Sequence, residues 1–96
     1  MRRTMAEKRA NPEIDALADT HGGVLRMEPA DVYDPAVIAF AIGVGSRQGQ
    51  TFLVYDRELV VEQAVFHEGM DYDTALEWHE FNTFCAYLGP GTPVYV

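Results

Sequence analysis

Six side chains that can bind metals or transfer protons lie within fourteen consecutive residues: His67, Glu68, Asp71, Asp73, His79 and Glu80. A metal-dependent hydrolase would need two imidazoles and a carboxylate, each about 2.0–2.2 Å from one ion. His67, His79 and Asp71 are the candidate ligands, but no His-x-x-x-His pair places two imidazoles on one helical face. The structural alternative is that Asp71 favours a helix start and His67 a helix end, through the helix dipole. We therefore predict no metal and no other cofactor.

Nucleophilic catalysis has a formal candidate in Cys85 with His79. A separation of six residues turns their side chains about 120° apart on one helix, and buried thiols are usually unreactive. The glycines at 43, 45 and 49 lack the lysine and the strand-to-helix order of a phosphate-binding loop. Ser46 has no nearby histidine in the sequence to activate it. The sequence thus predicts no catalytic residue and a non-enzymatic protein.

Two helices are expected to carry most of these side chains. Asp56 is a typical N-cap for a helix over 57–68, which Gly69 would end in the left-handed conformation. Asp71 is a second N-cap and predicts a longer helix over 72–88. The candidate side chains therefore surround the turn between the two helices.

The apolar run that follows Asp34 has two interpretations. Asp34-Pro35 offers an N-cap followed by proline at the first helical position, which favours a short helix over 35–44. The same pattern at Asn11-Pro12 predicts a further short helix. The alternative for 35–44 is a strand in a hairpin with 51–55, because periodicity alone cannot assign a short apolar run. The capping signal makes the helix our prediction.

The whole chain is predicted to form one compact α+β domain. The strands expected in its small sheet are 24–28 (VLRME), 51–55 (TFLVY) and 94–96 (VYV), covered by the three helices over 35–44, 57–68 and 72–88. Residues 11–96 would form the domain and residues 1–10 a flexible basic tail.

The helix over 72–88 is predicted to hold the fold together through an aromatic packing face. On a 100° wheel one arc of roughly 120° contains Trp78, Phe81, Phe84, Cys85 and Leu88. Burial of such side chains contributes roughly 1.5–3 kcal/mol each. Asn82 lies on the flank of the arc, where a half-buried amide needs a partner, so we expect it to bind a neighbouring loop or strand carbonyl. All six residues are thus predicted to be structural.

Composition favours a folded cytoplasmic protein. The apolar fraction is 48%, and the one cysteine cannot form an internal disulfide, which favours a reducing compartment. No stretch approaches the ~20 apolar residues of a membrane span, so no membrane contact is expected.

Charge separates the tail from the rest of the chain. The net charge is −8, yet Arg2, Arg3, Lys8 and Arg9 all lie in the first nine residues. Without these four residues and Glu7, three basic and fourteen acidic residues remain, a charge of −11. Such a surface repels nucleic acid and attracts basic protein surfaces. The predicted partner-binding residues are Glu58, Glu62, Glu68, Asp73, Glu77 and Glu80. The alternative is that this acidity only keeps a small protein soluble.

The stretch from residue 55 to the C-terminus contains a spaced set of residues: Tyr55-Asp56, Gly69-Met70, Ala75, Glu77, Phe81-Asn82, Ala86-Tyr87, Gly89, Thr92-Pro93 and Val96. In this set the stretch resembles a small phage and prophage protein family of unassigned function. The resemblance implies a phage or mobile-element origin and implies no activity.

Three hypotheses follow from the sequence. The first is a non-enzymatic phage accessory protein that binds a host protein with a basic surface, as a mimic of nucleic acid that inhibits a defence or nucleic-acid-handling complex. The second is a small metal-dependent hydrolase that uses His67 and His79. The third is a structural or assembly component, a homodimer joined through the edge of the strand at 94–96.

Overall fold

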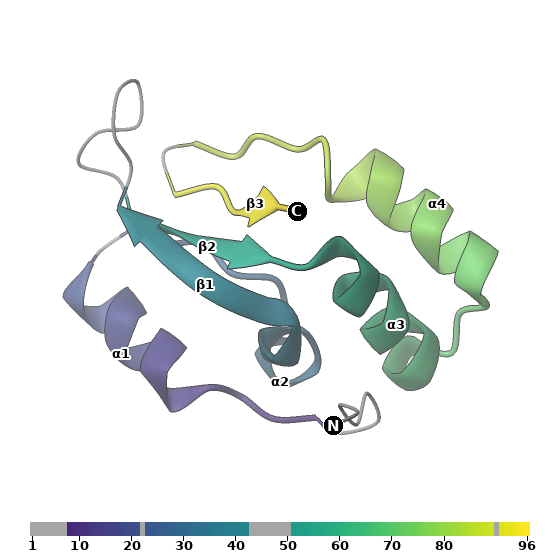
Figure 1. The fold of residues 1–96 in the computed structure, drawn as a ribbon, viewed down its shortest axis with the longest axis horizontal. Helices are drawn as coiled ribbons and strands as arrows, with labels where there is room; N and C mark the ends of the chain where they lie inside the picture. Colours follow the sequence, from purple (N-terminus) through teal and green to yellow (C-terminus); the bar gives the residue numbers. More distant parts are fainter. Residues whose placement is uncertain (1–7, 22, 43–50, 90) are drawn as a thin grey trace.

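The computed structural model describes residues 8–21, 23–42, 51–89 and 91–96. Its elements, in chain order, are α1 (Pro12–Thr20), α2 (Ala30–Tyr33), the 3-10 helix η1 (Asp34–Ala36), β1 (Val37–Ile42), β2 (Thr51–Tyr55), α3 (Arg57–Glu68), α4 (Tyr72–Asn82) and β3 (Val94–Tyr95) (Figure 1). These elements form one compact domain, which confirms the predicted α+β class. Of the predicted tail 1–10, residues 1–7 lie outside the described residues, and residues 8–10 are exposed.

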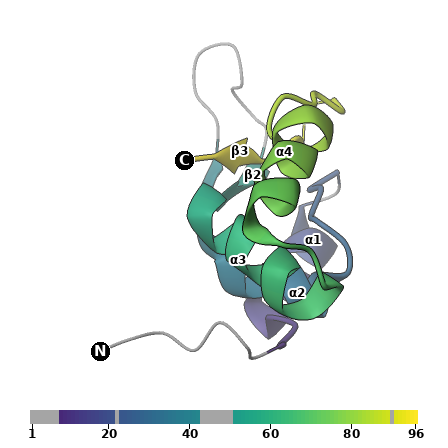
Figure 2. The ribbon, with the colours of Figure 1, turned by 90° about the vertical axis from the view of Figure 1, so that its right-hand side faces the viewer.

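The sheet has three strands in the order β1-β2-β3, with β1 antiparallel and β3 parallel to the central β2. Thr51, Leu53 and Tyr55 of β2 are buried and alternate with half-buried side chains, as expected for a strand with one face on the core. Viewed from the side, α1 and α4 lie on the same side of the strands (Figure 2). Ile14 of α1 and Val60 of α3 complete the larger core cluster against this buried face.

The predicted capping residues set the starts of three helices. The side chains of Asp56 and Asp71 accept backbone hydrogen bonds of 3.0 and 2.8 Å at the starts of α3 and α4, and Asn11 accepts one of 2.9 Å at the start of α1. Gly69 ends α3 with a φ of 73°, the left-handed conformation that favours glycine. The predicted strand at 51–55 forms, and the predicted edge strand at 94–96 forms over its first two residues.

The predicted helix over 35–44 is wrong. The alternative, a strand paired with 51–55, is correct for residues 37–42. Only one 3-10 turn forms at Asp34–Ala36, and β1 pairs antiparallel with β2. The Asp34 carboxylate does not cap a helix, because it accepts hydrogen bonds from the Asn11 N–H and the Arg26 guanidinium. Without that cap, the β-branched and aromatic residues of β1 adopt the extended conformation that suits them. Residues 43–50, including Ser46 and the glycines, lie outside the described residues.

The predicted strand at 24–28 is also wrong. The backbone N–H of Leu25 donates to the Gly91 carbonyl at 3.2 Å, and that of Met27 donates to the Tyr55 hydroxyl at 2.8 Å. The segment therefore bonds to a loop and to a side chain instead of to a neighbouring strand.

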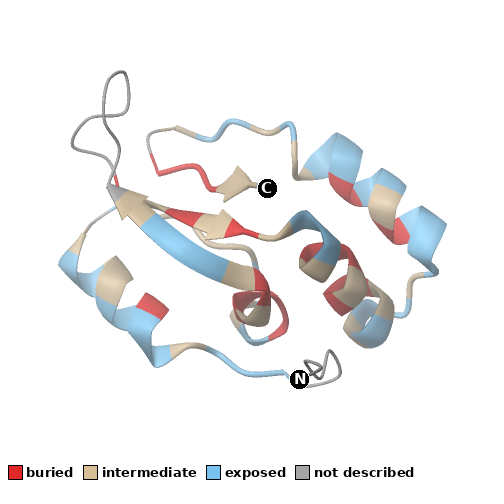
Figure 3. Ribbon diagram, in the orientation of Figure 1, coloured by how far each residue is buried: buried red, intermediate tan, exposed pale blue. Residues whose placement is uncertain are grey.

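The aromatic packing face predicted on the last helix is wrong for most of its members. Trp78, Phe81 and Leu88 are 47%, 80% and 72% exposed, and Cys85 is exposed as well. Most of α4 has the colour of exposed residues in Figure 3. Asn82 is also exposed, and its amide donates to the Trp78 carbonyl one turn earlier in the same helix, at 2.9 Å. Within the described part of the chain, the Asn82 side chain does not join the helix to a loop or strand.

Two physical reasons account for this error. The helix ends at Asn82 instead of residue 88, so a 100° wheel no longer relates the later residues to the earlier ones. The buried residues of α4 are Ala75 and His79, because the small Ala75 packs against Val61 and Ala64 of α3. Of the six predicted structural residues, Phe84 packs as expected, against both core clusters.

Candidate functional site

A cleft of about 310 Å³ opens between the loop 25–28, α4 and the C-terminal residues 86–89 and 91–95. Gly91 brings two of these walls together, since a Cβ at this position would lie 1.7 Å from the carbonyl oxygen of Gly23. The Thr92 hydroxyl stabilises the C-terminal wall, because it accepts from the Leu88 N–H and donates to the Gly89 carbonyl, each at 2.7 Å. The cleft is therefore bounded by segments distant in sequence but held by direct backbone contacts.

Aromatic rings in mutual contact line this cleft, with His79 at their centre. The His79 ring lies 5.0 Å from Trp78 and 5.7 Å from Tyr33, both edge-on, and 5.8 Å from the stacked ring of Phe84. Phe84, which does not itself line the cleft, also contacts Tyr95 at 5.1 Å. Trp78, Tyr33 and Tyr95 all line the cleft. A ligand in the cleft would thus meet π-systems instead of aliphatic side chains alone.

A chain of hydrogen bonds crosses the base of the cleft and ends on a carboxylate. The Tyr33 hydroxyl donates to Oε1 of Glu68 and lies 3.4 Å from Nε2 of His79. Nδ1 of His79 lies 2.8 Å from the Thr83 hydroxyl oxygen. One arrangement of protons satisfies all three contacts: Nε2 donates to Tyr33, and Nδ1 accepts from Thr83. We call Tyr33, Glu68, His79 and Thr83 the Tyr33 cluster.

The protonation of this cluster leaves Glu68 as its charged member. Burial lowers the pKa of His79, and the nearby Glu68 carboxylate only partly opposes this effect. Burial, assisted by the hydrogen bond to Glu68, raises the pKa of Tyr33. Both rings are therefore neutral at pH 7, and the Tyr33 cluster carries a net negative charge on an exposed carboxylate.

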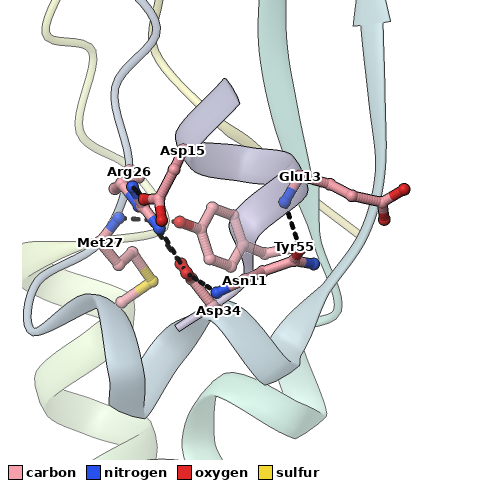
Figure 4. Close-up of polar contacts among 7 residues, drawn as sticks. All are labelled: Asn11, Glu13, Asp15, Arg26, Met27, Asp34 and Tyr55. Carbon is pink, nitrogen blue, oxygen red and sulfur yellow. Dashed lines mark hydrogen bonds and ion pairs between the residues drawn. The ribbon is translucent and has the colours of Figure 1, made fainter. Parts of the chain in front are cut away.

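Arg26 is the only cation among the described residues that line the cleft, and it is already neutralised. Its guanidinium forms ion pairs with Asp34 and, at 2.6 Å, with Asp15 (Figure 4). Asp34 is only 2% exposed, and it also accepts from the Asn11 N–H at 2.8 Å. The hydrogen bond to Asp34 is the main reason that the pKa of Arg26 is raised. We call Arg26, Asp34, Asp15 and Asn11 the Asp34 cluster.

The acidic residues predicted to bind a partner divide among three places. Glu68 lines the cleft. Glu58 accepts from the Tyr72 hydroxyl at 3.0 Å, and this hydrogen bond is the main reason that the pKa of Tyr72 is raised, with smaller contributions from the charges of Glu62 and Asp73. Glu77 and Glu80 are exposed on α4, where 100° per residue places them roughly opposite the cleft-lining residues.

The metal-site candidates do not converge in the described part of the chain. No three His, Cys, Asp or Glu side chains among those residues are arranged to hold a metal ion. His79 is buried among the aromatic rings, and Asp71 caps α4. His67 lies in the last turn of α3, as its helix-end interpretation predicts.

Sequence reasoning missed most of the cleft. Arg26 and Thr83 have no predicted role in a site, and the predicted packing arc does not include His79, although its side chain is only 1% exposed. A usable signal was the i, i+4 pair of Ala75 with His79, a spacing that puts both on the face toward α3.

Comparison with protein-family models, curated proteins and solved structures finds no match for this chain. Separately, none of the described helices has the length and apolar character needed to cross a membrane.

Proposed function

We propose that the chain is a non-enzymatic binding protein that uses the cleft to hold a basic, partly apolar surface of a host protein. The observation that supports this best is the combination of exposed apolar side chains with uncompensated negative charge at one place. Trp78 and Leu88 leave large apolar surfaces exposed in the cleft lining, where Glu68 has no cationic partner among the described residues. Exposed apolar patches with a polar rim are typical of protein interaction sites.

The net charge of −8 supports the same choice of partner. A strongly acidic protein is drawn toward basic surfaces over distances of about the Debye length, roughly 8–10 Å at physiological salt. Sites that bind nucleic acid combine Lys and Arg with exposed aromatic residues, so they would complement both features of the cleft. The proposed partner is therefore a nucleic-acid-handling or defence protein in the cytoplasm of a bacterial host. The phage origin implied by the sequence resemblance stays a prediction.

The test is affinity capture of host proteins on the immobilised chain at low and at raised salt. We expect a partner that is released by salt and is lost from the Glu68→Gln and Trp78→Ala variants. The matched controls are Asp19→Asn and Phe81→Ala, which make similar changes at exposed positions that do not line the cleft. The proposal would be contradicted if the amount of captured protein changed neither with salt nor in the two cleft variants.

A second candidate function, a self-associating assembly component, is favoured by the outer strand of the sheet. β1 is six residues long, lies at the edge and exposes Ile38 and Phe40. None of its residues is a Lys or Pro of the kind that protects edge strands. Association through β1 would therefore be more extensive than through the two-residue β3. Light scattering over a concentration series tests it, and a constant monomer mass would exclude it.

A further inference from the structure

We infer that the cleft accepts the side chain of an arginine from the partner protein, an assignment that rests on the proposed binding function and names the chemistry of its ligand. Three observations lead to it: the charge at the cleft, the aromatic rings, and the size of the cleft.

The negative charge of the two glutamates in the cleft lining favours a cationic ligand. Oε1 of Glu68 accepts the Tyr33 hydroxyl, whereas Oε2 has no hydrogen bond to any described residue. Glu28 also lines the cleft and is exposed. Because Arg26 is committed to two aspartates, a bound cation would find two glutamates and no competing internal cation in the described lining.

The aromatic rings of the cleft lining favour guanidinium over ammonium. Guanidinium is planar, stacks on aromatic rings and is more weakly hydrated than an ammonium group, so it loses less on entering a largely apolar cleft. The protein already makes one such contact, where the guanidinium of Arg57 lies 5.4 Å from the centre of the Phe84 ring. Trp78, half exposed and within the cleft lining, provides an equivalent surface to an incoming arginine.

The size of the cleft is sufficient for one inserted side chain. Its volume of about 310 Å³ lies at the lower end of the range for ligand pockets, roughly 300–1,000 Å³. A partner could thus insert an anchor residue, while the rest of its basic surface faces the acidic exterior. Such buried anchors, often arginine, dominate binding energies at protein interfaces.

The experiment titrates the full chain with four capped tripeptides, Gly-X-Gly, in which X is arginine, lysine, citrulline or norleucine. Trp78 is the only tryptophan, so its fluorescence reports directly on the cleft. We expect a saturable change with arginine, binding at least tenfold weaker with neutral citrulline and with norleucine, and weaker binding with lysine. Equal affinities for arginine and citrulline, or tighter binding of lysine, would overturn the assignment.

Variants locate the contact. Glu68→Gln should weaken arginine binding about tenfold, whereas Asp19→Asn, which makes the same change outside the cleft, should leave it unchanged. Glu28→Gln provides a second cleft variant if Glu68→Gln does not fold. Equal losses in a cleft variant and in Asp19→Asn would show non-specific attraction to an acidic surface and would overturn the site.

The two proposals fail in different ways. If salt-sensitive capture still depends on Trp78 but the peptides show no preference for arginine, the binding function stands and the arginine assignment falls. If the capture is also insensitive to the cleft variants, both fall.

Discussion

Two neighbouring residues, Tyr33 and Asp34, belong to two clusters that each contain a carboxylate. The clusters differ in whether that carboxylate is paired with a cation. Asp34 is buried with a cation, Arg26, and further hydrogen bonds satisfy its oxygens. Glu68, which holds the Tyr33 hydroxyl, is exposed and has no cation among the described residues. A buried charge is tolerated only when it is paired, whereas an exposed carboxylate keeps its solvation until a ligand displaces the water. The difference shows which carboxylate stabilises the fold and which one is available to another molecule.

The largest loss in the free energy of unfolding is expected from Asp34→Asn. The change keeps the shape of the side chain but leaves the Arg26 charge without its main partner, and removal of one member of a buried ion pair costs about 3–5 kcal/mol. Urea unfolding followed by circular dichroism should show this loss. The control is Asp15→Asn, the exposed partner of the same guanidinium, for which we expect a loss below about 1 kcal/mol. Similar losses in both variants would contradict a structural role specific to Asp34.

Asp34 also shows why part of the fold could not be predicted from sequence. Asp56 and Asp71 cap helices because their partners lie three residues away, so local sequence identifies them. The partners of Asp34 lie 8 and 23 residues away, and no local pattern reveals that Arg26 and Asn11 occupy its carboxylate. The cap-and-proline signal therefore predicted a helix where a strand forms.

The sequence could predict the acidic character of the candidate site, but not which side chains come together in it. Glu68 could be selected because acidity is visible in the sequence, but its link to Tyr33 spans 35 residues and that of Tyr33 to His79 spans 46. A helical wheel shows which residues share a face, and it does not show which face has a partner. That gap explains why Trp78 was predicted to be buried and is half exposed in the cleft lining.

The next largest loss in the free energy of unfolding is expected from Tyr33→Phe, in the buried part of the Tyr33 cluster. Tyr33→Phe removes the hydroxyl beside Nε2 of the buried His79, and an unsatisfied buried polar group costs about 1–3 kcal/mol. The control is Tyr72→Phe, because the Tyr72 hydroxyl also bonds to a glutamate, Glu58, but on the exposed surface. We expect its unfolding free energy to change by less than about 0.5 kcal/mol. A loss in Tyr72→Phe as large as that in Tyr33→Phe would show that burial is not the cause.

A pH-dependent effect of intermediate size is expected from His79. Its pKa is lower in the folded protein than the ordinary value of 6.5, mainly because of burial. The unfolded chain then binds more protons, so the stabilisation is fully present above about pH 6.5 and is lost as the pH falls below it. For one proton the slope is at most about 1.4 kcal/mol per pH unit. The urea midpoints of unfolding at pH 7.5 and at pH 5.5 measure this loss of stability. The difference between the two midpoints should be smaller in His79→Gln. An unchanged difference would assign the acid sensitivity to other groups.

The smallest effect on stability is expected from Glu68→Gln, which makes the same carboxylate-to-amide change as Asp34→Asn. The new amide keeps a carbonyl oxygen that can accept the Tyr33 hydroxyl, and the side chain is exposed. The free energy of unfolding should therefore change by no more than about 0.5 kcal/mol, as for most surface substitutions. Arginine binding should fall in the same variant, because that interaction depends on the charge and not on the hydrogen bond. If Glu68→Gln destabilised the protein as much as Asp34→Asn does, Glu68 would be a structural carboxylate, and the distinction between the two clusters would be lost.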